Sequence, residues 1–238
     1  MLIYLEDVLV AKDLKGREIR KKDKISEASL ARLPYYLRAL YVLDDEGYEI
    51  ASSQDLAELA GTNSAQVRKD LSYLGEFGRK GVGYNVKFLI QVLEKALGVS
   101  RKRTAVLVGV GRLGEAILSS KNIRERGFDF VAAFDIDPQK IGKTVAGVPV
   151  YSFDDLERVL EGEKIDIGII AVSPEAAQQV ADKLVKAGVK GILNFVPVPL
   201  KVSVPMRTVC IAAEMQLLSY EIKKKKPRQK RRTVRFGS

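Results

Sequence analysis

The sequence contains no histidine and no tryptophan, and only one cysteine among its 238 residues. Without imidazole there is no histidine general base, no histidine-containing triad and no histidine metal ligand, which excludes most hydrolase mechanisms and most zinc sites. A single cysteine cannot form a disulfide within the chain, which fits a reducing compartment. No stretch approaches the roughly 18 consecutive apolar residues of a membrane span.

The start of the chain also lacks the pattern of a signal peptide. Glu6 and Asp7 interrupt its apolar run, and no basic segment precedes that run. We therefore expect a cytoplasmic protein. With 46% apolar and 29% charged residues, a chain of this length can form one large or two ordinary domains around buried cores.

Basic residues are concentrated at one end of the chain. The 40 lysines and arginines outnumber the 30 acids, which gives a formal net charge of +10. Nine basic residues and no acid lie between residues 223 and 238, so residues 1–222 carry a net charge of only +1. This tail is either a solvated, disordered end or an accessory contact for nucleic acid. The overall charge is therefore no evidence for DNA binding by the rest of the chain.

Three helices are predicted in the first half. Residues 26–43 place leucines at three- and four-residue spacing, and Pro34 marks a break or a restart of this amphipathic helix. A shorter helix begins at Ser52 and ends at Gly61, which tolerates a left-handed turn. The segment Thr62-Asn63-Ser64 can cap a third helix that runs to about Leu74. The pattern is that of a helix-turn-helix.

The third helix has a core side and a polar side. Val67, Leu71 and Leu74 should face the core, so the polar and small residues are left for the major groove of DNA. The predicted contacts on this helix are Ser64, Ala65, Gln66, Arg68, Lys69 and Ser72. The glycine-rich stretch 77–86 predicts a hairpin wing whose Arg79 and Lys80 enter an adjacent minor groove. The alternative is a three-helix module that contacts only protein.

A glycine-rich motif opens the second half, after the linker at residues 101–103. The apolar run 104–108 is followed by Gly109-x-Gly111-x-x-Gly114 and a helical pattern, and a second strand ends at Asp135. This context of strand, helix and acidic residue is the one in which the motif binds a dinucleotide. Gly109 permits the tight turn, Gly111 the approach of a pyrophosphate, and Gly114 close packing of helix on strand.

The acid after the second strand indicates the type of dinucleotide. Asp135 can bond both ribose hydroxyls and would repel a 2′-phosphate, so we expect NADH or NAD⁺, with Asp137 as a second possible acceptor. Arg112 is placed to meet the pyrophosphate. The remaining loop residues assigned to the cofactor are Val110 and Leu113.

Strands and helices continue to alternate to about residue 196. This alternation predicts a doubly wound parallel sheet of the Rossmann type, with ligand at the carboxyl ends of its strands. Four residues at two such ends are expected to line the nicotinamide, or else to form only strand-end turns: Ala171, Val172, Asn194 and Phe195.

No catalytic machinery accompanies the nucleotide site. Tyr220 and Lys224 match the Tyr-x-x-x-Lys pattern of short-chain dehydrogenases, but they run into the basic tail, and the loop glycines are spaced differently from that family. No substrate domain remains once the two units are assigned. A ligand-controlled switch explains the chain better than an oxidoreductase or a nucleotide-binding protein scaffold.

Several motifs together resemble the bacterial redox-sensing transcriptional repressor Rex family. They are Lys24 to Tyr36, Val67 to Tyr73, Gly78 to Val86, Gly109 to Gly114, Phe134 to Asp137 and Lys190 to Phe195. The resemblance implies a non-enzymatic homodimer that binds palindromic operator DNA and releases it when NADH rises relative to NAD⁺. It also implies a C-terminal helix at 212–222 that is swapped between subunits.

The expected fold class is α/β, with a winged helix-turn-helix domain followed by a Rossmann-type domain and the swapped helix. The predicted divisions are an extension at 1–23, DNA-binding domain at 24–100, dinucleotide domain at 101–211, swapped helix at 212–222 and basic tail at 223–238. In some relatives an aspartate before the final helix pairs with an arginine that matches Arg38. Cys210 stands at the matching position here and cannot form that ion pair.

Overall fold

A computed structural model of the chain describes residues 25–79 and 81–224. The chain divides into two compact units between Lys102 and Arg103. The predicted N-terminal extension and all of the basic tail after Lys224 lie outside the described residues. Each unit is considered by itself below.

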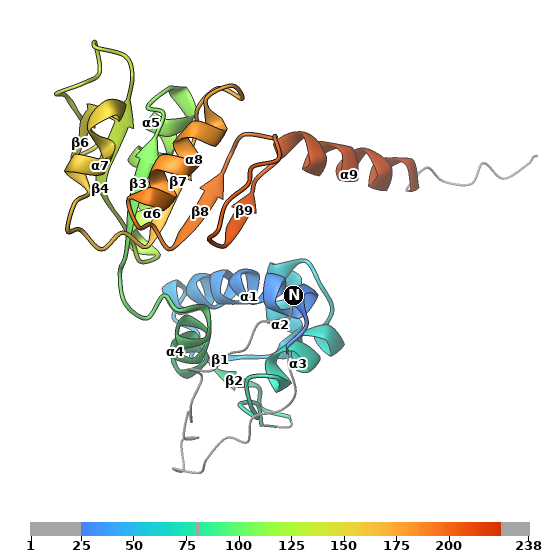
Figure 1. Ribbon diagram of the computed structural model, residues 1–238. Coiled ribbons are helices and arrows are strands. Elements are labelled where there is room, and N and C mark those ends of the chain that lie inside the picture. Colours follow the sequence, from blue (N-terminus) through green and yellow to red (C-terminus); the bar gives the residue numbers. More distant parts are fainter. Residues whose placement is uncertain (1–24, 80, 225–238) are drawn as a thin grey trace, which may run out of the picture. The chain divides into compact units, whose positions relative to one another are not determined.

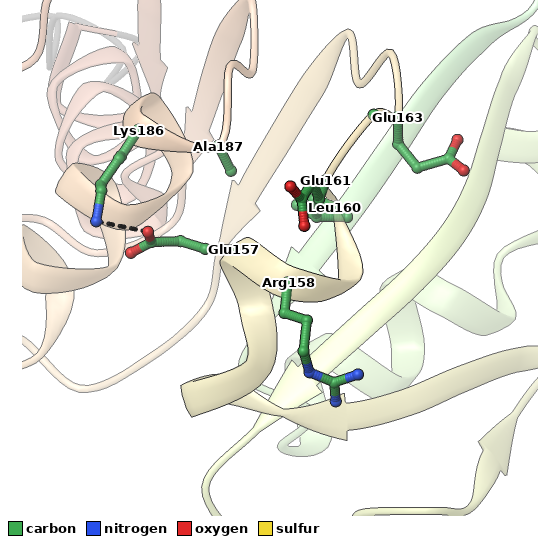
Figure 2. Close-up of a pocket in the computed structure, with 8 residues that line it drawn as sticks. Glu157, Arg158, Leu160, Glu161, Glu163, Lys186 and Ala187 are labelled. Carbon is green, nitrogen blue, oxygen red and sulfur yellow. Dashed lines mark ion pairs between the residues drawn. The ribbon is translucent and has the colours of Figure 1, made fainter.

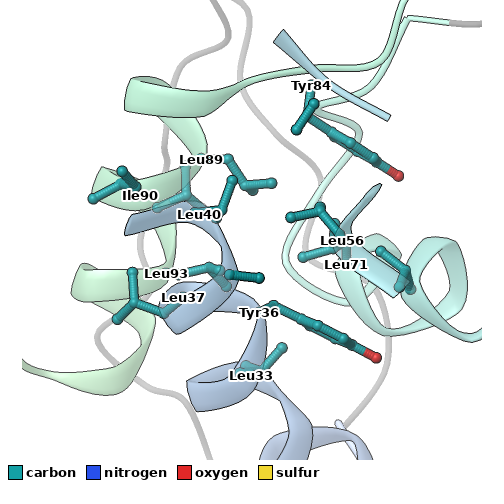
Figure 3. Packing of buried hydrophobic residues seen from close by; sticks show 14 of the residues in the cluster. Leu33, Tyr36, Leu37, Leu40, Leu56, Leu71, Tyr84, Leu89, Ile90 and Leu93 are labelled. Atoms are coloured by element: carbon teal, nitrogen blue, oxygen red, sulfur yellow. The ribbon is translucent and has the colours of Figure 1, made fainter. Parts of the chain in front are cut away.

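Residues 25–79 and 81–102 of the first unit form four helices and one small sheet (Figure 1). The helices are α1 (Glu27–Asp45), α2 (Ser53–Ala60), α3 (Ser64–Ser72) and α4 (Val86–Leu97). Two short strands, β1 (Ile50–Ala51) and β2 (Tyr84–Asn85), pair in the antiparallel direction. Figure 3 shows how leucines from all four helices meet in one core, to which Tyr36 adds a fully buried ring.

The predicted turn between α2 and α3 is confirmed. The hydroxyl of Ser52 accepts hydrogen bonds from the N–H groups of Gln54 and Asp55, and the carboxylate of Asp55 accepts one from the N–H of Ser52, which completes a capping box. Gly61 ends α2 in the left-handed region at φ 68°. Asn63 caps α3 through the N–H of Gln66. The local polar residues therefore define both helix ends, as the sequence indicates.

The structure corrects one prediction in this unit and adds one helix. The helix α1 continues through Pro34 without a break, and Pro34 lies on its exposed side. The ring removes only one intrahelical donor, and the buried leucines on both sides hold the helix in register. The helix α4 had not been predicted, although Leu89, Ile90 and Leu93 repeat at helical spacing and are buried.

The predicted hairpin is present after α3. Arg79 and Gly83 form an antiparallel bridge, in which the N–H of Arg79 donates to the carbonyl of Gly83 at 2.9 Å. Gly78 packs so closely on the ring of Tyr84 that an added Cβ would lie 2.8 Å from it. This contact lies within the hairpin, whereas Gly83 packs on β1, where an added Cβ would lie 2.5 Å from the carbonyl oxygen of Ala51.

The second unit is a seven-stranded sheet with the order β5-β6-β4-β3-β7-β8-β9. All pairs are parallel except β5 with β6. The strands are β3 (Arg103–Val108), β4 (Phe128–Asp135), β5 (Thr144–Val145), β6 (Val148–Ser152), β7 (Ile167–Ile170), β8 (Gly191–Asn194) and β9 (Met206–Thr208). Without β5, this is the Rossmann order 3-2-1-4-5-6, with the switch point beside β3.

Helices cover both faces of this sheet. They are α5 (Arg112–Ser119), α6 (Lys121–Glu125), α7 (Leu156–Val159), which follows the 3₁₀ turn η1 (Phe153–Asp155), and α8 (Ala177–Lys186). Leu107 of β3 packs in the cluster that includes Leu118 of α5. Its neighbour Val106 packs in the cluster that includes Leu184 of α8. The alternation along one strand confirms the doubly wound α/β arrangement.

The last helix, α9 (Ile211–Lys224), differs from the others because every side chain from 211 to 223 is exposed. Its apolar residues include Ile211, Met215, Leu218 and Ile222, each more than half exposed. Among residues 25–79 and 81–224, no helix combines the length and the apolarity needed to cross a membrane.

Candidate functional site

The glycine-rich loop lies between β3 and α5, at the switch point of the sheet. Gly109 has φ 98°, and an added Cβ would lie 2.3 Å from the carbonyl oxygen of Ala171. At Gly114 an added Cβ would lie 2.1 Å from the carbonyl oxygen of Gly109. Both glycines are therefore required by contacts within the protein, which couple β3, β7 and the first turn of α5.

Gly111 is different because a Cβ there would meet no atom within 4 Å. It is the N-cap residue of α5 and supplies no side-chain cap, so the first N–H groups of the helix remain for another acceptor. Arg112, the first residue of α5, is exposed. Open space, backbone donors and a cation at one helix start fit the pyrophosphate of a dinucleotide.

Asp135 connects the end of β4 to the glycine-rich loop. Its carboxylate accepts hydrogen bonds from the N–H of Val110 at 2.7 Å, the N–H of Asp137 at 2.9 Å and the ammonium of Lys140 at 3.3 Å. Burial by itself would raise the pKa of Asp135, but these donors outweigh it and hold the pKa below its ordinary value. The side chain thus stays ionised and holds the loop in place.

The residues just after Asp135 extend this edge of the site. Ile136 is 80% exposed, which is unusual for an isoleucine, and Leu113 on α5 is also exposed. Asp137 is more exposed than Asp135 and pairs with Lys140 at 3.8 Å. Neither Ile136 nor Lys140 was singled out from the sequence. The signal available for them was only their closeness to Asp135.

The strand-end residues beyond β7 and β8 have distinct surroundings. Ala171 and Val172 are half-buried beside Gly109. Asn194 is fully buried, and its amide bridges both the N–H and the carbonyl of Val196. The N–H of Phe195 donates to Ile170 across the strands. Asn194 therefore shapes the turn through its own side chain, and any contact of the four with a nicotinamide stays a prediction.

A hollow elsewhere on the second unit is not this site. Figure 2 shows it lined by Glu157 and Arg158 of α7, the turn that follows, and Lys186 at the end of α8. Lys186 and Glu157 pair at 2.6 Å. The ends of α7 and α8 lead into β7 and β8, so the hollow lies at the amino edge of the sheet. In an α/β sheet, ligands bind at the opposite, carboxyl edge.

The polar side of α3 carries the predicted DNA contacts. Ala65 and Lys69 are exposed, and Ser64 is half-buried. Arg68 donates to the hydroxyl of Ser53 at 2.9 Å, which places its guanidinium beside the start of α2. The hydroxyl of Ser72 donates to the carbonyl of Lys69 within the helix. Cations and small polar groups thus share the solvent side of α3, whereas Val67 and Leu71 are buried.

The hairpin provides a second basic element in this unit. Arg79 is exposed at the base of its turn, next to Gly81 and Val82. Lys80 lies outside the described residues, so its predicted contact with a minor groove stays a prediction.

A buried carboxylate connects α3 to α1. Asp70 has no exposed surface, and its two oxygens accept hydrogen bonds from Arg32 at 2.6 and 2.9 Å and from the hydroxyl of Tyr36 at 2.7 Å. Gln66 donates to the same carboxylate at 2.7 Å. Sequence analysis had not singled out this cluster, because an aspartate beside Lys69 on a polar helix carries no signal of burial.

Opposing effects determine the charges in this cluster. Burial would raise the pKa of Asp70, but the donors Arg32, Tyr36 and Gln66, together with Ser29, hold it below its ordinary value. The hydrogen bond to Asp70 raises the pKa of Arg32, and burial with that same carboxylate raises the pKa of Tyr36 to about 12. At neutral pH the cluster is an ion pair with a neutral tyrosine.

Comparison with known proteins follows the same division into two units. A family model described as a putative DNA-binding protein N-terminus matches residues 24–72, and one described as a CoA binding domain matches residues 100–198. The redox-sensing transcriptional repressor Rex of Desulfitobacterium hafniense is 49% identical over 201 residues, which are 84% of this chain and 96% of that protein. The chain belongs to the Rex family.

Other Rex relatives agree with this assignment. The repressor of Streptomyces avermitilis is 45% identical over 84% of this chain and 81% of its own length. A crystal structure of the repressor RSP with β-NAD⁺ and operator DNA matches with a TM-score of 0.76 and 36% identity, over 85% of this chain and 94% of that one. The crystal structure of RSP with β-NADH matches with a TM-score of 0.75 and 35% identity, over 85% of this chain and 96% of that one.

Proposed function

We propose that this chain is a redox-sensing transcriptional repressor, which binds operator DNA through its first unit and releases it when NADH occupies the second. One observation carries this proposal. A single chain of the Rex family contains both a helix-turn-helix with a hairpin and a glycine-rich loop of the kind that binds dinucleotides. The Rex relatives are named repressors rather than enzymes. Such a repressor acts where the bacterial chromosome lies, so we assign it to the cytoplasm.

The dinucleotide is proposed to lie across the carboxyl edge of the sheet. The helix start at Gly111 and Arg112 would hold the pyrophosphate, and Asp135 with the more exposed Asp137 would receive the adenosine ribose. Three donors already occupy Asp135, which leaves it about one of four acceptor positions. The carboxylates of Asp135 and Asp137 would repel the 2′-phosphate of NADP(H). Lys140 does not offset this repulsion, because it is already paired with both.

The nicotinamide ring would then reach the ends of β7 and β8. Ala171, Val172 and Phe195 offer mainly apolar and backbone contacts there, with no proton donor or acceptor side chain for hydride chemistry among them. The bound dinucleotide supplies the redox state that is sensed, and the protein responds to which form is bound. A ligand shifts a conformational equilibrium only by binding its two states with different affinity.

The DNA contacts are proposed on α3 and the hairpin. Ser64, Ala65 and Gln66 begin α3, the part of a recognition helix that meets base edges in the major groove. Lys69 and Arg68 are suited to phosphates, which position the helix without reading sequence. Arg79, with Lys80, would enter the neighbouring minor groove.

Adding NADH is expected to weaken operator binding about tenfold or more, whereas NAD⁺ is not. Fluorescence anisotropy at fixed salt measures this, with an operator selected by the protein itself from random duplexes. NADPH is the control, because Asp135 and Asp137 disfavour its additional phosphate. Equal operator affinity with and without NADH would contradict the sensing function and leave DNA binding itself unaffected.

We propose that the active form is a homodimer in which α9 packs on the partner subunit. The support is the apolar stripe at positions 211, 215, 218 and 222, which follows helical spacing and is exposed on the chain by itself. Two subunits also match a palindromic operator, because half-sites about one helical turn apart mirror the two-fold axis.

Replacing Leu218 with glutamate is expected to weaken the dimer roughly 100-fold, since two copies of a buried leucine are lost and two charges are introduced at one interface. Size-exclusion chromatography with light scattering measures the dissociation. The matched control is Gln216→Glu, which adds the same charge on the opposite side of α9. Unchanged dimerisation in the Leu218 variant would exclude α9 from the interface.

A further inference from the structure

The amide of Gln66 has one fixed orientation in the first unit. Its Nε2 lies 2.7 Å from Oδ1 of Asp70. Arg32 forms a bidentate ion pair with this carboxylate, which is therefore ionised and has no hydrogen to donate. The atom of Gln66 that faces it must be the NH₂ group. A flipped amide would place two acceptor oxygens against each other.

This orientation leaves one acceptor and one donor of Gln66 for a ligand. The NH₂ group has two hydrogens, of which Asp70 takes one. Among the described residues, Oε1 of Gln66 accepts no hydrogen bond, and the residue is half-buried. Gln66 is also the third residue of α3, and the cap at Asn63 holds its backbone N–H at 2.9 Å. Both the backbone and the amide are thus fixed before any DNA is bound.

The ion pair does not need Gln66 for its own stability. Oδ1 of Asp70 already accepts from Arg32, and Oδ2 accepts from Arg32 and Tyr36. Three of the roughly four acceptor positions of the carboxylate are therefore occupied without Gln66, which fills the remaining one. Asp70 thus holds the amide of Gln66, and the bidentate pair with Arg32 stays in place when Gln66 is replaced.

We propose that Asp70 is a positioning residue that sets the base specificity of this repressor through Gln66. The fixed amide presents an acceptor oxygen beside an N–H donor. That pair complements the N6 amino group and the N7 acceptor of adenine in the major groove. One adenine in each half-site is thus read by Gln66, and Asp70 prevents the flip that would lose this preference. The inference rests on the proposed function, because it requires that α3 lies in the major groove.

The test begins with a duplex that the wild-type protein selects from a random-sequence pool, followed by substitution of each base pair in turn. In the wild type, replacement of the adenine read by Gln66 is expected to weaken binding about tenfold or more. In Gln66→Ala, substitution of that adenine should no longer weaken binding, while substitutions at other base pairs should weaken it as in the wild type. Asp70→Asn is expected to reduce the same penalty, because an amide at position 70 accepts either orientation of Gln66.

The double variant separates positioning from a merely structural role. If Asp70 acts through Gln66, Asp70→Asn has no further effect on base preference in the Gln66→Ala background. A merely structural role would instead lower affinity for every duplex and leave the pattern of preference unchanged. The control is Arg68→Ala, which is expected to weaken all duplexes alike, because a phosphate contact carries no sequence information.

Gln66→Glu tests the inference at the reading residue itself, because the new carboxylate is repelled by Asp70 and turns away from it. It keeps an acceptor but removes the donor, so the preferred base is expected to change from adenine to cytosine, whose N4 amino group a carboxylate accepts. Retained adenine preference in both Gln66 variants would overturn the inference, even if Asp70→Asn fails to fold. If the wild type selects no sequence from the pool, the proposed function itself fails.

Discussion

Gly111→Ala is expected to abolish detectable dinucleotide binding, with a loss of at least about 100-fold, and to leave the fold unchanged. The new methyl group meets no atom of the protein within 4 Å, so nothing in the second unit has to move. It occupies the open space beside the first N–H groups of α5, where the pyrophosphate has to approach closely. The resulting operator complex should no longer respond to NADH.

Isothermal titration with NADH and thermal unfolding measure these two effects separately. The matched variant is Gly114→Ala, in which the added methyl lies 2.1 Å from the carbonyl of Gly109 and forces the backbone to shift. That variant should lose both binding and thermal stability. If Gly111→Ala binds NADH normally, the pyrophosphate does not lie at this helix start.

Asp70→Asn is expected to destabilise the first unit by about 3 kcal/mol, the range found when one partner of a buried ion pair is removed. The Arg32 side chain is 30% exposed and cannot fully regain water in its place. The loss should appear in the stability of the first unit, because Arg32 and Tyr36 of α1 lose their charged partner on α3. Thermal unfolding of the full chain, followed by circular dichroism, measures the loss.

The effect of Asp70 should depend on pH in a defined direction. Because its pKa is lower in the folded protein, the ion pair contributes its full stability above the unfolded pKa of about 3.9. That contribution is lost as pH falls through the lower folded pKa. The stability difference between wild type and Asp70→Asn should therefore be constant from pH 7 to about pH 5 and diminish below pH 4. A difference that persists unchanged at pH 2 would contradict this account.

Much of the fold could be predicted because helix ends, strands and turns depend on residues that are close together in the sequence. Ser52, Asn63 and Gly61 define the turn between α2 and α3 through short-range hydrogen bonds and a left-handed residue. Alternating apolar strands and the glycine-rich loop predict the parallel sheet. The break or restart predicted at Pro34 was wrong, because burial on both sides of a proline can outweigh the loss of one hydrogen bond.

The site was harder to predict, because the decisive contacts join residues far apart in the chain. The spacing of Gly109, Gly111 and Gly114 indicates a dinucleotide loop, but only packing shows that two of them meet protein and one meets open space. Asp135 was expected only to receive a ribose. It also holds Val110, 25 residues earlier, and this bond requires β3 and β4 to lie side by side.

The sequence by itself determined that this protein joins a helix-turn-helix to a Rossmann-type sheet in the pattern of the Rex family. These predictions rest on helix caps, on the spacing of apolar residues and on the spacing of glycines. Each of these patterns spans only a few residues, so it is visible in the sequence. The tertiary structure decided which polar groups are buried and which remain for ligands. Asp70 shows the physical reason: its burial depends on Arg32 and Tyr36, more than 30 residues away, which together offset the cost of removing a carboxylate from water.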